Sequence, residues 1–262
     1  MKESNEMSFL GHVEVFRWHL IRSFFAIIFI SIIAFIFKDI LFDKILLRPK
    51  EIDFPTYVIL CNISKYLGLG ETLCLKESPF YLMNINMSGQ FSMHIMASFF
   101  AGFVISFPYV FWEIWSFIRP ALYKNEKKIV RGVVFFSSFL FLLGVLFGYY
   151  VIAPLSINFL GSYQVSNVVA NQINLTSFIS TITTVCLANG LVFELPILVY
   201  FLTKAGLLTP LFMRVYRKHA IVCTLVLSAI ITPPDITSQI LVSLPLIILY
   251  EFSIIISAWV IR

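Results

Sequence analysis

The chain has 262 residues and a formal net charge of +5; hydrophobic residues make up 59% of it and charged residues 13%. Ordinary soluble domains hold about 45–50% apolar and about 25% charged residues, so this composition excludes a disordered chain, a disulfide mini-protein and a typical cytosolic enzyme. A multi-pass membrane protein remains. In such a protein Lys and Arg also set the orientation, so the basic charge does not indicate nucleic-acid binding.

Long runs without charged residues predict an all-α fold with six transmembrane helices. A span needs about 20 mostly apolar residues. The charge-free run 132–193 is long enough for two spans, and polar residues from Gly161 to Thr176 divide it. Thr232-Pro-Pro-Asp235 separates the last two helices, because proline cannot continue a helix. The expected helices cover residues 20–40, 90–115, 131–155, 176–203, 216–231 and 237–258.

The fifth and sixth expected helices are short, with about 16 and 22 residues. A helix of 16 residues reaches about 24 Å, less than a hydrocarbon core of about 30 Å, which predicts either a thinned bilayer or a covering neighbour beside them. The sequence shows no internal repeat, and we interpret residues 1–262 as one transmembrane domain. Residues 41–89 form an extended polar loop within it.

The distribution of basic residues predicts the orientation. If alternate connections lie on one side, 13 of the 19 Lys and Arg residues fall on the side of the two termini, and the other six fall in the long loop. The positive-inside rule then places both termini in the cytoplasm and residues 41–89 outside. Residues 1–22 are too charged for a cleavable signal peptide, so we expect the first span to be retained.

Carboxylates within the spans are conspicuous, because each costs about 2.5–3.5 kcal/mol on insertion. Glu194 lies in the middle of the fourth span, two residues before Pro196, which should loosen the helix there. One interpretation is a protonated carboxyl group hydrogen-bonded inside the bundle. The other is a functional polar site within the membrane, and the two do not exclude each other.

Other acidic residues lie near the ends of helices. Asp235 precedes the sixth helix and is typical of a helix cap, and Gln239 shares its face one turn later. This polar stripe can also receive a partner, and Glu251 lies further along the same helix. Glu113, near the inner end of the second span, is expected to be an exposed carboxylate at the membrane surface.

The predicted cytoplasmic connection from Phe117 to Lys128 contains one acidic residue, Glu126, among several bases. Lys127 or Lys128 can neutralise it. Alternatively, Glu126 can accept an incoming guanidinium as a bidentate pair, which arginine forms far better than lysine.

The four cysteines fall into two groups. Cys186 and Cys223 lie in spans and are expected to be small apolar residues. Cys61 and Cys74 both lie in the predicted outer loop, where a disulfide persists. We predict a bridge between them that stabilises the protein by roughly 3 kcal/mol.

Motifs of common enzymes are absent from the sequence. It contains no HExxH zinc pair, no GxSxG elbow and no GxxxxGK[ST] phosphate loop, and its four histidines are scattered. We therefore expect neither an enzyme nor a cofactor or metal. Without a nucleotide loop, any work by this protein must draw on a partner or on the membrane potential.

Five stretches, taken in order, resemble the TatC family of twin-arginine protein translocases. The N-terminal stretch resembles its HL-x-E-L-R motif, the first cytoplasmic connection its F-I-x-P-A-L-Y-x-x-E, and the fourth span its F-E-x-P. The last two resemble its T-P-P-D-x-x-S-Q turn and its L-Y-E. The five stretches are Met7–Arg17, Phe117–Glu126, Phe193–Pro196, Thr232–Gln239 and Leu249–Glu251.

The resemblance implies a Sec-independent translocase subunit in the bacterial inner membrane, with a cup-shaped bundle that binds twin-arginine signal peptides of folded precursors. Export would be driven by the proton motive force, with single-span TatA-type and often TatB-type partners in a multi-copy complex. The implied signal-binding residues are Phe117, Pro120, Tyr123, Glu126, Arg17 and Glu14. Glu194 matches the buried glutamate of the family, and the implied partner-docking residues are Gln239, Asp235 and Glu251.

The sequence departs from the family pattern at one position. Val15 stands where the family usually has glutamate. Either Glu14 substitutes from about 100° around the helix, or that carboxylate is lost. Two other classes of function fit the sequence less well: a proton-coupled transporter using Glu194, for which the expected internal repeat is absent, and an intramembrane enzyme, for which a motif is absent.

Overall fold

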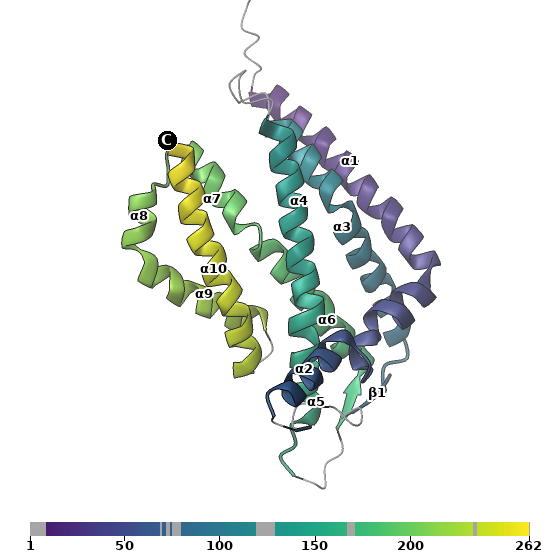
Figure 1. Cartoon of the computed structure of the whole chain (residues 1–262). Coiled ribbons are helices and arrows are strands. Elements are labelled where there is room, and N and C mark those ends of the chain that lie inside the picture. The colour runs from purple at the N-terminus through teal and green to yellow at the C-terminus, as the bar shows by residue number, and fades with distance from the viewer. Residues whose placement is uncertain are drawn as a thin grey trace, which may run out of the picture. The chain divides into compact units, whose positions relative to one another are not determined.

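Helices form most of the chain, and the apolar runs of the sequence become its longest helices (Figure 1). This computed structural model describes residues 9–68, 70–71, 74, 80–118, 129–166, 171–232 and 235–261. The α-helices are α1 (Phe9–Ile36), α2 (Pro55–Tyr66), α3 (Gly89–Ile118), α4 (Ile129–Phe147), α5 (Ala153–Ser162), α6 (Leu175–Val192), α7 (Leu195–Lys204), α8 (Pro210–Val215), α9 (Arg217–Ile231) and α10 (Ile236–Ile261). The strands are β1 (Tyr81–Met83) and β2 (Gln172–Asn174), and shorter helical turns cover Ile40–Leu46, Arg48–Lys50 and Gly148–Ile152.

Within the described residues, five helical stretches are long and apolar enough to cross a membrane. The predicted all-α, polytopic membrane fold is therefore confirmed. The fifth predicted span corresponds to α9, whose 15 residues reach only about 22 Å and fall short of a core of about 30 Å. The five stretches are Val13–Ile36, Gly89–Phe117, Gly132–Ser162, Leu175–Lys204 and Ser238–Ile261.

The sixth helix is longer than predicted. α10 has 26 residues and reaches about 39 Å, so the expectation of a short sixth helix is wrong. It begins directly after Asp235, whose carboxylate accepts a hydrogen bond from the Ser238 amide at 3.0 Å. The apolar run beyond Glu251 contains no glycine or proline, so the helix continues to Ile261.

The chain forms two compact units. The first joins Met1–Phe37 with Ser98–Phe139, and the second joins Lys38–Ala97 with Leu140–Arg262. In the first unit α1 lies along the second part of α3 (Figure 1). The helices approach closely at Gly102, because a Cβ atom there would lie 2.8 Å from the backbone nitrogen of Ser31 and 2.9 Å from the carbonyl oxygen of Ile27.

In the second unit α10 packs along α7 and crosses α9 (Figure 1). An apolar cluster of Ile152, Val185, Val242 and Leu246 is almost completely buried at its centre. Hydroxyl pairs also join the helices: Thr203 donates to Ser257 at 2.9 Å, and Ser156 and Ser238 share a hydrogen bond of 2.7 Å. Small polar side chains of this kind are common between membrane helices, because each satisfies the other away from water.

Residues 41–89, predicted as a polar outer loop, contain regular structure. Besides α2 they include β1, which pairs in parallel with β2 so that Leu82 lies opposite Ile173. α2 is held by the Tyr57 hydroxyl, which donates to the carbonyl of Pro154 at 2.8 Å and lies 3.1 Å from that of Pro49. Burial raises the pKa of this phenol, so Tyr57 stays protonated and remains a donor.

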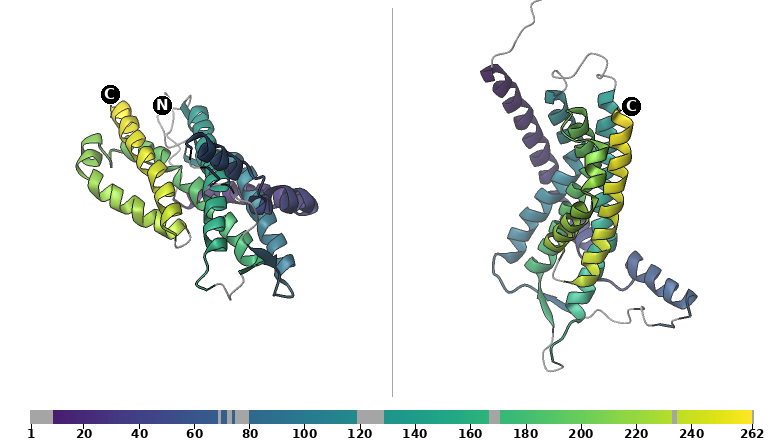
Figure 2. Two further views of the ribbon diagram at one scale, coloured as in Figure 1. Left: turned by 60° about the horizontal axis from the view of Figure 1, so that its bottom comes forward. Right: turned by 90° about the vertical axis from the view of Figure 1, so that its left-hand side faces the viewer.

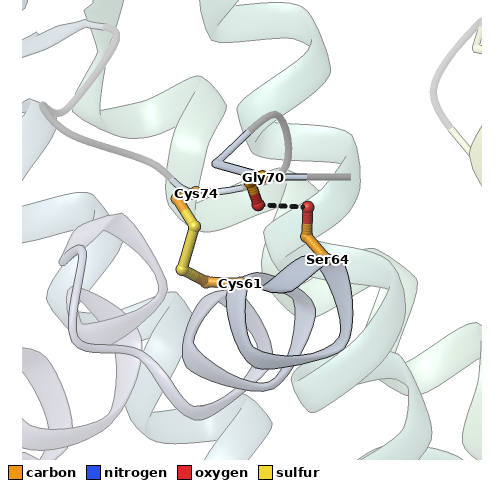
Figure 3. The surroundings of a disulfide bond; sticks show 4 residues. All are labelled: Cys61, Ser64, Gly70 and Cys74. Carbon is orange, nitrogen blue, oxygen red and sulfur yellow. Dashed lines mark hydrogen bonds between the residues drawn. A yellow bond between two sulfur atoms is a disulfide. The ribbon is translucent and has the colours of Figure 1, made fainter. Parts of the chain in front are cut away.

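A disulfide joins Cys61 of α2 to Cys74, with 4.5 Å between their Cα atoms (Figure 3). The Ser64 hydroxyl donates to the carbonyl of Gly70 at 2.9 Å, which holds the same segment on the helix. Gly68 and Gly70 allow the tight return of the chain, because both have positive φ angles, 72° and 66°.

We expect two reactive thiols per unfolded chain before reduction, those of Cys186 and Cys223, and four after reduction. Counting alkylated cysteines by mass spectrometry checks this. Four reactive thiols without reductant would contradict the bridge.

Replacing Cys61 by Ser should lower the stability by roughly 3 kcal/mol, since a constraint on the unfolded chain is lost.

Gly144 permits close packing of α4 on α6. A Cβ atom at Gly144 would lie 2.6 Å from the carbonyl oxygen of Asn189 and 2.9 Å from the Cα atom of Gly190. Both are backbone atoms, so neither can move aside unless the helix moves with it. Gly144→Val should therefore cost about 1–3 kcal/mol through overpacking. Gly132→Val is the matched control, because a Cβ atom at Gly132 meets nothing within 4 Å. Equal melting temperatures for the two variants would contradict this packing.

Candidate functional site

A cluster of polar side chains joins α1 to α3 in the first unit. Nδ1 of His19 lies 2.5 Å from Oε2 of Glu113, and the Tyr109 hydroxyl donates to Oε1 of the same carboxylate at 2.8 Å. Each carboxylate oxygen of Glu113 therefore has one partner. Tyr109 lies one turn earlier in α3, and His19 lies on α1. A carboxylate held by two donors is strongly fixed in position.

The expectation that Glu113 is an exposed surface carboxylate is wrong, because only 7% of the residue is exposed. Two observations in the sequence could have indicated the pair. His19 lies in a largely apolar span, Glu113 lies in another, and each needs a polar partner away from water. Their separation of 94 residues hides this relation from any local pattern.

The exposed residues at the start of α1 include two predicted signal-binding residues, Glu14 and Arg17. The ring of Phe16 lies 4.9 Å from that of Phe117, and the His19 ring lies 6.2 Å from the same side chain, measured between centroids. The structure therefore brings the first turns of α1 beside Phe117, another predicted site residue. Pro120, Tyr123 and Glu126 lie outside the described residues.

Glu194 lies where the fourth span breaks. α6 ends at Val192 and α7 begins at Leu195, as expected from Pro196 in the first turn of α7. The amide of Glu194 donates to the carbonyl of Leu191 at 3.1 Å, so the chain turns tightly here before the next helix begins. Glu194 is half-buried at this break.

Asn189 is a polar residue near this break that no sequence motif indicated. It is 1% exposed and donates to the carbonyl of Val185 at 2.8 Å. Its side-chain oxygen is buried, and no described atom donates to it. A buried amide oxygen without a donor is costly and marks a polar point inside the second unit.

Two polar residues at the start of α10, Asp235 and Gln239, make different contacts. Asp235 is buried and caps the helix through its bond to the Ser238 amide, and its second oxygen has no donor among the described residues. Gln239, one turn later, is half-buried and donates to the carbonyl of Leu225 at 3.3 Å. Gln239 therefore bridges α10 to α9.

Glu251 forms a bidentate ion pair with Arg217. The Arg217 Nε atom lies 2.8 Å from Oε1 of the carboxylate, and a terminal guanidinium nitrogen lies 2.9 Å from Oε2. This planar fork joins the first turn of α9 to α10. The Glu251 side chain remains 42% exposed, so the pair lies at the surface of this unit.

Among the described residues, no group of three or more His, Cys, Asp or Glu side chains is arranged to hold a metal ion. The polar side chains instead form pairs and caps.

We expect Glu113→Leu to destabilise the protein by about 1–3 kcal/mol, because it leaves the donors of His19 and Tyr109 without their acceptor. The double variant His19→Phe/Glu113→Leu should recover much of this loss, since replacing both members of a buried pair is often nearly neutral. Melting temperatures of the purified protein measure both effects. Strictly additive losses in the double variant would contradict the coupling.

Comparison with known proteins identifies the family. The family model described as "Sec-independent protein translocase protein (TatC)" matches residues 11–245. The protein of that name from Blattabacterium sp. subsp. Periplaneta americana (strain BPLAN) is 42% identical, over 98% of this chain and 97% of its own length. The Helicobacter pylori (strain J99) protein is 48% identical over 63% of this chain and 66% of its own.

A solved structure has the same fold. A crystal structure described as the twin arginine translocase receptor TatC covers 96% of this chain and 100% of its own, with a TM-score of 0.69 and 31% identity. The order of the sequence motifs, the polytopic helical fold and these matches agree. The chain belongs to the TatC family of Sec-independent protein translocase proteins and is a multi-pass membrane component of that translocase.

Proposed function

We propose that this protein is the receptor of its translocase: it binds the twin-arginine signal peptides of folded precursors and organises single-span partners for their export. The observation that carries the proposal is the match over nearly the whole chain to proteins described as TatC and to a structure described as a twin arginine translocase receptor. The chemistry of the candidate residues supports it.

In this proposal Glu126 accepts the guanidinium of a signal arginine. A carboxylate can take arginine through two parallel hydrogen bonds, and lysine cannot reproduce that fork. Phe117, Pro120 and Tyr123 of the same connection are apolar or aromatic residues within nine positions of it in the sequence. The exposed first turns of α1 adjoin Phe117 through Phe16, so Glu14 and Arg17 lie where the second half of the site would form.

The signal-binding connection must face the compartment where precursors are made. We place the protein in the bacterial inner membrane with both termini in the cytoplasm, because 13 of its 19 basic residues then lie inside. Residues 41–89, with their disulfide, then face the oxidising outer compartment. Both assignments rest on the charge distribution.

We assign partner docking to the edge formed by α9 and α10. Gln239 and Glu251 place half-buried polar groups there, with the buried Asp235 capping the start of α10, and a single-span TatA-type or TatB-type helix can satisfy its own polar residue against this edge. α9 is too short for a bilayer of ordinary thickness, so lipid beside it must thin or be replaced by a partner. A thinner membrane lowers the cost of moving a folded protein, with the proton motive force as the source of energy.

The apolar part of the signal would lie near Glu194. This carboxyl group is half-buried at the break between α6 and α7, where the membrane-spanning backbone is irregular. Irregular backbone in a membrane helix is tolerated where protein or a polar cavity covers it. Glu194 therefore suits a functional role better than a place facing lipid.

Glu126→Gln should reduce photo-crosslinking of a twin-arginine signal about 10–100-fold, because a charged bidentate contact is lost. Lys127→Gln is the matched control and should crosslink normally. Val15→Glu, at an exposed position of α1, should strengthen signal capture by adding a carboxylate where the family usually has one. Undiminished capture by Glu126→Gln would contradict the assigned site.

The second candidate function is a proton-coupled transporter, favoured by the half-buried carboxyl group of Glu194 in a broken helix. Proton flux into liposomes distinguishes the receptor from the transporter. The receptor proposal predicts equal decay of a pH gradient with the native protein, Glu194→Gln and empty liposomes. A flux that Glu194→Gln abolishes would favour the transporter.

A further inference from the structure

α2 presents an apolar face that nothing in the described structure covers. Three of its large side chains, and that of Leu67 directly after it, are exposed at positions separated by four, three and one residues, which places them on one side of a helix. The exposed Val58 lies beyond the edge of this face. The opposite side of α2 is buried and includes Tyr57 and Ser64. The exposed residues are Ile59 at 57%, Ile63 at 46%, Tyr66 at 93% and Leu67 at 63%.

The disulfide leaves this face open. Cys61 and Ser64 both point toward the segment of Gly70 and Cys74, which lies against the other side of the helix (Figure 3). The covalent bridge and the hydrogen bond therefore fix the segment away from Ile59 and Ile63. Asn62 and Lys65 lie at the edge of the apolar face, where a lysine stem can extend its charge into water.

The start of α2 is fixed to a known point on the third span. The ring of Phe54 stacks on that of Tyr150 with 5.6 Å between centroids, the Thr56 hydroxyl donates to the Tyr150 carbonyl, and the Tyr57 hydroxyl donates to that of Pro154 at 2.8 Å. The depth of Tyr150 in the membrane therefore sets the depth at which α2 begins.

Helix length gives that depth. A Cβ atom on Gly148 would lie 2.9 Å from the Cα atom of Cys186, so the two positions are level on adjacent helices. From Cys186 to Lys204 the fourth span covers at most about 27 Å, because it breaks between α6 and α7, and a lysine at the end of a span lies at the membrane surface. Since the hydrocarbon core is about 30 Å thick, Tyr150 and the start of α2 lie near the opposite surface of the membrane.

The direction of α2 agrees with this depth. Figure 2 (right) shows α2 lying crosswise to α10 and projecting sideways from the second unit. Because α10 is long enough to cross the membrane, a helix crosswise to it lies along the membrane plane. A stable protein interface needs about 20–30 residues on each side, and the apolar face of α2 offers four large side chains.

We propose that α2 is an interfacial helix, which rests in the boundary between lipid headgroups and acyl chains with Ile59, Ile63, Tyr66 and Leu67 in contact with lipid. Helices of this kind bury an apolar face by about 5–10 Å and place tyrosine and lysine at the headgroups. The disulfide and the Tyr57 hydrogen bonds would then hold an anchor at one membrane surface. The inference concerns α2 alone and does not depend on signal binding.

The test places a photo-reactive amino acid at Ile63, and separately at Ile59, in the full chain in native membranes with radiolabelled lipid. Val165 is the control, because it is 90% exposed. It follows Ser162, the last residue of α5, which lies about 18 Å further along the helix than Tyr150. After illumination, we expect labelled lipid adducts at positions 59 and 63 to exceed those at 165 at least fivefold.

Alkylation of the same samples checks that each variant retains the Cys61–Cys74 bridge and is folded. A covalent dimer of the chain would overturn the proposal in favour of a second copy on this face. An adduct with a different protein would overturn it in favour of a partner. Lipid adducts at 59 and 63 no more abundant than at 165 would show that α2 lies in water, and would overturn it as well.

Discussion

A polar group within the hydrocarbon core must find its partner inside the protein, and most features of this structure follow from that constraint. Backbone groups are satisfied by forming helices. Side-chain groups are satisfied in pairs, and each pair joins two helices: His19 with Glu113, Thr203 with Ser257, and Ser156 with Ser238. The same contacts that satisfy polar atoms therefore also determine which helices pack together, since apolar side chains alone gain little by leaving lipid for protein.

Departures from this rule occur in both units: Ser98 and Ser138 of the first unit each keep a buried polar atom without a described hydrogen-bond partner, and further departures lie in the second unit. The backbone breaks at Glu194, Asn189 and Asp235 each keep a buried oxygen without a described donor, and α9 is too short to cross an ordinary bilayer. Each feature costs free energy in lipid, so a protein that needed only stability would gain by losing them. Under the receptor proposal, a single-span partner beside α9 would cover the place where this short helix does not match the bilayer.

Hydropathy predicted most of the fold, because about 20 apolar residues in a row have few stable alternatives to a membrane helix. It did not predict the length of α10, since helix ends depend on capping and on the absence of a breaker rather than on hydropathy. The pairing of His19 with Glu113 lies beyond any local pattern, as do α2 and the β1–β2 pair inside residues 41–89. Of the predicted signal-binding residues, the structure describes Glu14 and Arg17 on α1 and Phe117 on α3. The proposed role of Glu126 rests on its chemistry and on the family resemblance.

The account depends on one claim about topology: the connection that carries Glu126 faces the cytoplasm, where precursors wait. Asn125→Cys, in a chain with Cys186→Ala and Cys223→Ser, leaves one reactive thiol beside the disulfide. A membrane-impermeant maleimide applied to inverted inner-membrane vesicles and to intact spheroplasts reads its side directly. The account predicts labelling in the vesicles and none in the spheroplasts; labelling in the spheroplasts would contradict it.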